Sequence, residues 1–151
     1  MLRLSTRAAA IAAMVVASSL GTIALSTGVA SASAPTVTCT IFSATASGKA
    51  TLNACNDTGN TGGKGTEVAN LKASTAVITW NKTGTTTTKY SYAAVTPDKC
   101  AKGSSEIKET ATVTGGTGAA VKSIPKGQVA TLLLCIKGTA ISLLPGQKYQ
   151  I

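Results

Sequence analysis

The stretch TWNKTGTTTTKYSY, residues 79–92, carries the clearest structural signal in the chain. Apolar or aromatic side chains alternate with polar ones on both sides of a short segment that contains Gly84. Alternation with a period of two predicts β-strands, and a glycine between two such runs predicts the turn of a hairpin. We therefore predict two antiparallel strands joined near Gly84.

The length of this turn decides which side chains face the same way. A two-residue turn would leave both tyrosines of the second strand on the wrong face. A three-residue turn at residues 82–84 pairs Trp80 with Thr86 and Ala76 with Tyr90, so that the aromatic side chains share one face. Because burial favours the second register, we predict the three-residue turn, with its glycine in a left-handed conformation.

The same alternation recurs along most of the chain. The predicted strands lie within residues 36–42, 48–55, 75–80, 85–92, 106–114, 129–136, 139–144 and 148–151. The predicted inward sets include Val37, Cys39 and Ile41; Ala50, Leu52 and Ala54; Ala76, Ile78 and Trp80; and Ile107, Ala111 and Val113. Residues 129–136 are apolar on both faces, which predicts a central strand covered on both sides. About eight short strands separated by Gly and Pro predict an all-β fold, an antiparallel β-sandwich or barrel.

The first residues have the pattern of a secretory signal peptide. Arg3 and Arg7 precede an apolar run over residues 8–20 and a small-residue stretch that ends VASASAP. We predict cleavage after Ala32 or Ala34 and favour Ala32, because the second cut would place Pro35 next to the broken bond. Residues 1–32 are then the signal peptide, and residues 33–151 form one secreted domain with no membrane span.

Four cysteines follow the predicted cleavage site: Cys39, Cys55, Cys100 and Cys135. An even number in an exported chain predicts two disulfides, for which three connectivities are possible. We predict the pairing with the shortest loops, Cys39–Cys55 and Cys100–Cys135. The spacing lacks the C-x-x-C pairs of structural zinc sites, which argues against a zinc centre.

The charge is strongly positive, and two residue types are missing. Without Arg3 and Arg7 the chain has 12 lysines against 5 acidic residues, a formal charge of +7. The chain has no histidine at all, which excludes Ser-His-Asp and Cys-His catalysis and removes the commonest metal ligand. The predicted mature part has no arginine, the residue that reads guanine and phosphate in pairs of hydrogen bonds, so we expect no nucleic-acid partner.

The segment CNDTGNTGGKGTE, residues 55–67, resembles a site more than any other stretch. It departs from a phosphate-binding loop because Gly65 follows Lys64 where Ser or Thr is needed, and no helix pattern comes next. Oxygen-bearing side chains over residues 53–60 allow a calcium loop, although calcium sites usually contain several carboxylates. We interpret residues 56–66 as a mobile surface connection and leave open whether they bind an ion.

Other candidate motifs are weaker. Glu106 and Glu109 are three residues apart on a predicted strand and therefore face opposite ways, unlike the facing pair of a glycosidase. Glu109 is in phase with Ile107 and Ala111, which we interpret as the exposed end of the strand in preference to a buried ion pair with a lysine. Rows of alternating threonine are expected on the wet face of a sheet.

Four stretches together resemble a known group of proteins: GNTGGKGT, VITWNKTGTTT, ETATVTGGTGAA and SLLPGQKYQI. The chain is similar, over roughly Cys39 to Ile151, to small exported actinobacterial proteins with a comparable four-cysteine layout and a Leu-Pro-Gly ending. The resemblance implies an envelope or extracellular β-domain. It implies no assigned activity, so no catalytic residue is carried over.

We therefore expect a secreted, basic, disulfide-stabilised binding module, extracellular or in the cell envelope, without catalytic residues, cofactor or metal. Its expected partner is an anionic envelope polymer or another extracellular protein. One alternative is a small inhibitor or effector, which would present an exposed rigid loop tied by Cys100. The other is an enzyme, which would need a concave pocket holding Lys64 or Lys108 beside an acid.

Overall fold

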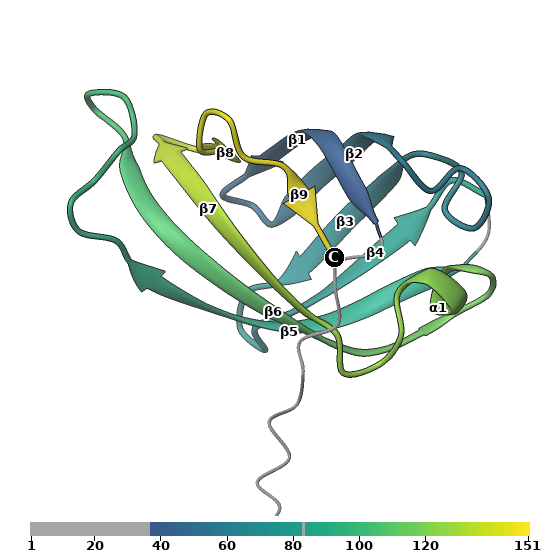
Figure 1. Ribbon diagram of the computed structural model, residues 1–151. Helices are drawn as coiled ribbons and strands as arrows, with labels where there is room; N and C mark the ends of the chain where they lie inside the picture. Colours follow the sequence, from purple (N-terminus) through teal and green to yellow (C-terminus); the bar gives the residue numbers. More distant parts are fainter. Residues whose placement is uncertain (1–36, 83) are drawn as a thin grey trace, which may run out of the picture. The chain divides into compact units, whose positions relative to one another are not determined.

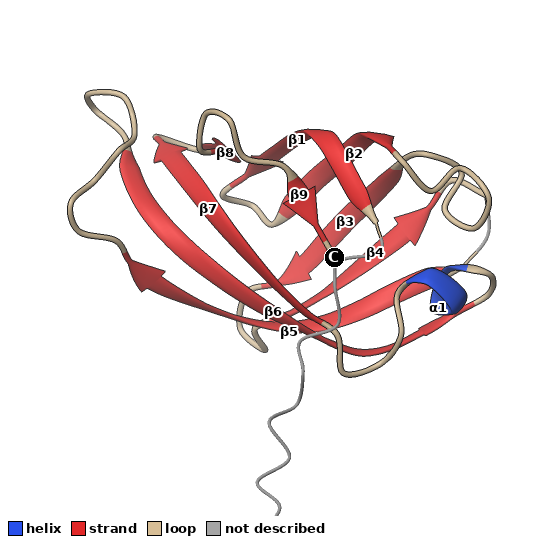
Figure 2. Cartoon of the chain, in the orientation of Figure 1, coloured by secondary structure: helices blue, strands red, loops and turns tan. Residues whose placement is uncertain are grey.

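The computed structural model describes residues 37–82 and 84–151 (Figure 1). The predicted signal peptide and both predicted cleavage positions lie outside these residues. Figure 2 shows that strand makes up most of the described chain, with one short helix beside it. The strands are β1 (Thr38–Thr45), β2 (Lys49–Cys55), β3 (Gly65–Asn70), β4 (Thr75–Trp80), β5 (Thr85–Ala94), β6 (Ser105–Thr117), β7 (Val129–Lys137), β8 (Ala140–Leu143) and β9 (Tyr149–Gln150), and the helix is α1 (Ala120–Ser123).

The first eight strands form a closed antiparallel barrel. Each strand pairs with the next along the chain, and β8 returns to pair with β1 through Ser43 opposite Ser142 and Ala44 opposite Ile141. The ninth strand, β9, pairs with the beginning of β1, where Cys39 lies opposite Tyr149. The prediction of an antiparallel all-β fold is confirmed, and of its two alternatives the structure has the barrel.

The long β5–β6 hairpin bends where its register shifts. Between Thr87 and Thr88 the ladder skips one residue of β6, Thr114, whose hydroxyl donates a hydrogen bond of 3.1 Å to the carbonyl of Thr87. An extra residue in one strand increases its local bend and twist. The bend lets these two strands curve around the barrel (Figure 1).

One strand of the barrel was not predicted. Residues 56–66 are predicted to be a connection with Glu67 at its end, whereas the structure has β3 at Gly65–Asn70, paired on both sides. The predicted total of about eight is nevertheless close to the nine strands of the described residues. The eight predicted strands include β9, which lies outside the ring, and omit β3.

The predicted register of the β4–β5 hairpin is wrong by two residues. Ile78, not Trp80, lies opposite Thr86, and Ala76 lies opposite Thr88. The turn therefore starts one residue earlier than predicted, with the amide of Trp80 donating to the carbonyl of Gly84 at 3.1 Å. The predicted positive φ of Gly84 is confirmed at +96°.

Two predicted inward residues point outward. Ile41 is 54% exposed, and Ala54, which is also exposed, has a φ of +50°. Both β1 and β2 change face at this level, so that Phe42 takes the inward place expected of Ile41 and Cys55 takes that of Ala54. The prediction of strict alternation fails because two neighbouring strands share one irregularity.

The threonines of β5 do not all lie on the solvent-exposed face of the sheet, where the sequence predicted them. Thr86 is 1% exposed and Thr88 is 3% exposed, both inside the barrel. Thr86 is satisfied there, because its hydroxyl oxygen accepts a hydrogen bond of 2.9 Å from the indole Nε1–H of Trp80. A hydroxyl can occupy the core when it has such a partner.

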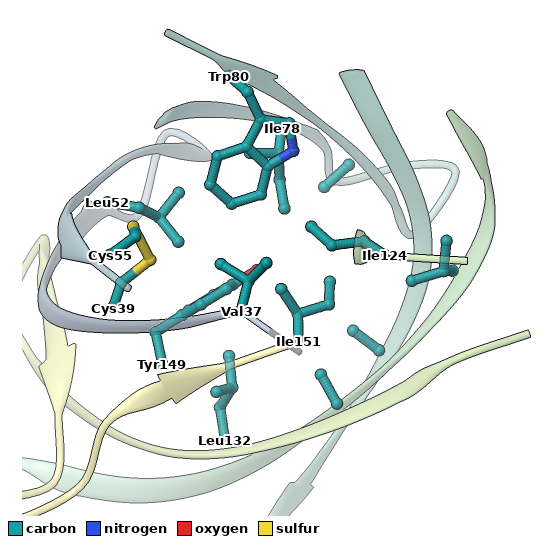
Figure 3. Packing of buried hydrophobic residues seen from close by; sticks show 14 of the residues in the cluster. Val37, Cys39, Leu52, Cys55, Ile78, Trp80, Ile124, Leu132, Tyr149 and Ile151 are labelled. Carbon is teal, nitrogen blue, oxygen red and sulfur yellow. A yellow bond between two sulfur atoms is a disulfide. The ribbon is translucent and has the colours of Figure 1, made fainter. Parts of the chain in front are cut away.

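One end of the barrel is closed by large side chains. Figure 3 shows them converging from several strands and from the segment after α1. The labelled members are Val37, Cys39, Leu52, Cys55, Ile78, Trp80, Ile124, Leu132, Tyr149 and Ile151. Gly65 belongs to this closed end, because a Cβ there would lie 2.8 Å from the Trp80 ring. Absence of a side chain at this position lets the indole pack flat against β3.

Both predicted disulfides are confirmed. Cys39–Cys55 joins directly paired residues of β1 and β2, and Cys100–Cys135 ties the β5–β6 loop to β7. All four cysteines are therefore oxidised, as is usual in an extracytoplasmic compartment. The prediction that β7 is covered on both faces holds only near Cys135, because Val129 is 41% exposed.

Candidate functional site: a cavity at the open end of the barrel

The end of the barrel opposite the large side chains contains a cavity of about 350 Å³. It lies where the β1–β2 and β3–β4 turns meet the ends of β5 and β7 and the beginnings of β6 and β8. Its lining residues are Phe42, Ala44, Thr45, Ala46, Gly48, Ala50, Glu67, Ala69, Leu71, Tyr92, Ile107, Glu109, Leu134, Ile136 and Ile141. A volume of this size is typical of pockets that hold small molecules, and an eight-stranded barrel can enclose one such ligand.

Small inward residues create this space. At this end the inward positions of β1, β2 and β3 are the alanines Ala44, Ala50 and Ala69. At the closed end the same strands carry Cys39, Leu52 and Gly65, and the space above Gly65 is filled by the Trp80 ring. An alanine leaves unfilled the volume that a leucine or tryptophan would occupy. The cavity therefore follows from residue size on strands that are otherwise continuous.

The mouth of the cavity carries exposed apolar surface. Leu71 in the β3–β4 turn is 55% exposed, and Tyr92 near the end of β5 is 51% exposed. Both also line the cavity. Large apolar side chains that remain exposed at the rim of a hollow are typical of ligand or partner sites.

Two carboxylates lie inside the same cavity. Glu67 comes from β3 and Glu109 from β6, and both are partly buried. Burial raises the pKa of Glu67 to about 7. Burial, and then the charge of Glu67, raise the pKa of Glu109 to about 7, while a hydrogen bond with Tyr92 acts in the opposite direction. Near neutral pH each carboxyl group is therefore partly protonated.

Tyrosines surround this acidic pair. Tyr92 lines the cavity, and Tyr90, one inward position deeper on β5, packs against it with ring centroids 5.1 Å apart. Tyr149 is buried and stacks on Phe42 with ring centroids 5.6 Å apart. Burial first, and then the charges of Glu67 and Glu109, raise the pKa of Tyr149, so it stays neutral at physiological pH. The cavity thus combines apolar walls with hydrogen-bonding groups of low charge.

The structure corrects the interpretation of Glu109. Its inward phase with Ile107 and Ala111 is as predicted, but it faces a cavity and a second glutamate, where the sequence analysis placed it at an exposed strand end. Glu106 lies on the other face of β6. It is 4% exposed, and its carboxylate accepts a hydrogen bond of 2.7 Å from the backbone amide of Lys99.

A second acidic group is structural. Asp98 and Glu106 lie close to Cys100, but the Cys100 sulfur is in a disulfide. The two Asp98 oxygens accept hydrogen bonds from the amides of Cys100, at 2.7 Å, and Glu106, at 3.2 Å. Through these hydrogen bonds, Asp98 and Glu106 stabilise the conformation of the β5–β6 loop.

Residues 56–66 form part of the closed end and are more ordered in their contacts than the sequence analysis expected. Thr61 is fully buried, and its hydroxyl donates to the carbonyl of Asp57. The side chain of Asn60 donates to the hydroxyl of Ser123 in α1 at 2.6 Å, and Oδ1 of Asn56 accepts from the amide of Thr38 at 2.9 Å. Residues 56–64 connect β2 to β3 as predicted, and these hydrogen bonds hold the connection in place; its mobility stays a prediction. Two of the oxygens considered for calcium, Oδ1 of Asn56 and Oδ1 of Asp57, accept hydrogen bonds from backbone amides.

The pocket required for the enzyme alternative is not where the sequence placed it. Lys64 lines a surface depression of about 420 Å³ over β2–β4, and no acidic residue lines that depression within the described residues. Lys108 is exposed on the outer face of β6. The arrangement that this alternative needs is therefore not found in the Lys64 depression.

No protein-family model, no curated protein and no solved structure matches this chain. The resemblance to actinobacterial proteins therefore stays a prediction. None of the helices in residues 37–82 and 84–151 has the length and apolar character needed to cross a bilayer.

Sequence reasoning missed Glu67 and the pairing of two glutamates. Glu67 lies on the strand that was not predicted, so its inward direction could not be inferred. The local pattern points the other way, because the only large apolar residue beside it, Val68, would be expected to face inward but is 60% exposed, whereas Glu67 lines the cavity. Both glutamates line the same cavity, and the charge of Glu67 raises the pKa of Glu109.

Proposed function

We propose that this protein is an extracellular binding module that takes a small, largely apolar molecule into the open end of its barrel. The observation that carries this proposal is the cavity of about 350 Å³ between Ala44, Ala69 and Ile141, open to solvent beside Leu71 and Tyr92. The closed end gives the site a firm floor, because its core side chains are packed and buried. The two disulfides suit a protein that works outside the cytoplasm.

The proposal is tested by filling the cavity. Ala44→Phe places an aromatic ring in the cavity from β1, whereas Ser43→Phe places the same ring on the outer face of the adjacent position. We expect a fluorescent apolar dye to bind the wild-type protein and Ser43→Phe equally, and to lose at least about tenfold in affinity for Ala44→Phe. Equal binding by all three proteins would place the dye site outside the cavity and contradict the proposal.

Retention in the cell envelope is the finer part of the proposal. All 12 lysines are exposed, whereas Glu67 and Glu109 are directed inward. The outer surface is therefore more positive than the formal charge indicates, which favours loose attachment to an anionic envelope polymer. We expect 0.5 M NaCl to release the protein from intact envelopes, because salt screens such contacts. Release only by detergent would contradict this attachment.

The β5–β6 loop supports a second candidate function. It projects from the barrel in Figure 1, it is tied to β7 by Cys100–Cys135, and Asp98 and Glu106 brace it internally. These are the features expected of a small inhibitor or effector that inserts a rigid loop into a partner. Capture of one defined extracellular protein by the wild type, but not by a variant with Lys99 and Lys102 changed to Ala, would favour this function.

A further inference from the structure

The acidic pair in the cavity has no positive partner. No lysine lines the cavity among residues 37–82 and 84–151, and the lysines of β2, β5 and β6 are exposed on the outside of the barrel. The remaining titratable groups that face Glu67 and Glu109 are tyrosines, Tyr90 and Tyr92 on β5 and Tyr149 on β9, which carry no positive charge. A carboxylate enclosed without a cation is unfavourable, because burial removes its hydration.

A buried hydroxyl near the pair is also unsatisfied. Tyr90 is only 6% exposed, and its hydroxyl has no hydrogen-bond partner within the described residues. Burial, and then the charges of Glu109 and Glu67, raise the pKa of Tyr90. Buried polar groups without partners are rare and usually have one in the functional state. The Tyr90 hydroxyl, which can both donate and accept, is therefore free to make a further hydrogen bond.

We propose, building on the binding function above, that the ligand is an organic cation whose ammonium group is held by Glu67 and Glu109 while its apolar body contacts the alanine and isoleucine walls. An ammonium group supplies the missing charge and has several N–H donors for the carboxylates and the tyrosine hydroxyl. The aromatic faces of Phe42 and Tyr92, which line the same cavity, add a favourable environment for a cation.

The walls favour an organic cation over a metal ion. Calcium requires about six to eight oxygen ligands, whereas the cavity offers two carboxylates and otherwise mostly Ala, Ile and Leu side chains. An apolar acid is disfavoured above pH 7, because its carboxylate would then meet two carboxyl groups that are mostly charged. An apolar alcohol can enter, but it leaves the acidic pair without a counter-charge.

The experiment compares three probes of equal chain length: octylamine, 1-octanol and octanoate. Titration calorimetry at pH 8 measures their affinity for the wild type, for Glu67→Gln, for Glu109→Gln and for the double variant. Val68→Lys is the matched control, since it changes the formal charge by the same amount as Glu67→Gln but on the outer face of the same strand. Circular dichroism checks that each variant is folded.

We expect octylamine to bind the wild type at least about tenfold more tightly than 1-octanol, and the double variant to lose about 10- to 100-fold in octylamine affinity, the range of a hydrogen bond to a charged group. Val68→Lys should bind like the wild type. At pH 5 the preference for octylamine should shrink, because both glutamates, whose pKa values are about 7, are then protonated while the amine keeps its charge.

The outcomes separate this inference from the binding function on which it rests. If 1-octanol binds as tightly as octylamine and the Gln variants change neither affinity, the cavity binds ligands but does not select cations, and the inference is wrong. If octanoate binds most tightly, the inference is also wrong. If none of the three probes binds and Ala44→Phe has no effect on dye binding, the proposed function fails as well.

Discussion

The two ends of the barrel are built from the same strands and differ in the size and polarity of their inward side chains. At the closed end, Leu52, Ile78 and Trp80 meet the segment that follows α1 and leave no large space. At the open end, alanines take the corresponding inward positions, and two glutamates replace apolar residues. One end is a packed hydrophobic core, and the other end encloses a cavity.

This difference shows how a small barrel can enclose a cavity. Side chains fill the interior of an eight-stranded barrel when they are large, and an interior lined by small residues remains hollow. A hollow with buried carboxylates costs stability, which the closed end must offset through dense packing. Equivalent substitutions at the two ends should therefore change the stability of the fold by different amounts.

The largest difference is expected for removal of apolar volume. Ile78→Ala at the closed end should lower the free energy of unfolding by about 2 to 5 kcal/mol, because the fully buried side chain leaves a void among packed neighbours. Ile141→Ala at the open end should cost about 1 kcal/mol or less, because its side chain already borders a cavity. Urea unfolding measures both values. Equal losses at the two ends would show that the open end is packed as tightly as the closed end.

The next effect is a dependence of stability on pH that comes from the open end alone. The pKa values of Glu67 and Glu109 are raised to about 7 in the folded chain, above the value of about 4.3 for an unfolded glutamate. Between these values the folded state binds more protons than the unfolded state, so stability contributed by these groups falls as pH rises from about 4.5 to 7 and stays low above it. Each group should account for a loss of about 1 to 3 kcal/mol.

Glutamine variants isolate this contribution. Compared with the wild type, Glu67→Gln and Glu109→Gln should be relatively more stable at pH 8 than at pH 5, whereas the outer-face variant Val68→Lys should show no such change. Thermal unfolding at the two pH values gives the comparison. A wild type whose stability rises between pH 5 and 8 relative to both Gln variants would reverse the predicted sign and show that the pair is stabilised as carboxylates.

The last predicted difference between the two ends concerns added volume on a single strand. Gly65→Ala should destabilise the protein by about 1 to 3 kcal/mol, because the new Cβ would lie 2.8 Å from the Trp80 ring. Ala69→Val, four residues later on the same face of β3, should change stability by about 0.5 kcal/mol or less, since its added methyl groups enter the cavity. Urea titrations of the two variants give the contrast, and a larger loss for Ala69→Val would contradict it.

Much of the fold could be predicted because period-two alternation and paired cysteines are local signals. The face of each strand in the β4–β5 hairpin was correct even though its register was not. A shift of two residues leaves every side chain on its original face, so burial cannot distinguish Ile78 opposite Thr86 from Trp80 opposite Thr86. Register is set by the turn, and the turn contains no signal strong enough to choose between the two.

The site could not be predicted for a related reason. The inward positions of β3 are Gly65, Glu67 and Ala69, none of which is a large apolar residue. Gly65 is small to admit Trp80, and Glu67 and Ala69 line the cavity. A strand that surrounds a hollow lacks the apolar alternation by which strands are recognised, so β3 could not be found from the sequence.

The ladder between β8 and β1 has a consequence for the order of folding. Every other contact between barrel strands joins neighbours in sequence and can form as a local hairpin. By contrast, the β8–β1 ladder joins residues from nearly opposite ends of the described chain, such as Ser43 and Ser142. Val37 and Ile151 are equally distant in sequence, and they exchange two backbone hydrogen bonds. Contacts between such distant residues carry the largest entropic penalty and slow folding most. A row of hairpins should therefore assemble first, and the interior that defines the cavity should come into existence only when this seam is joined.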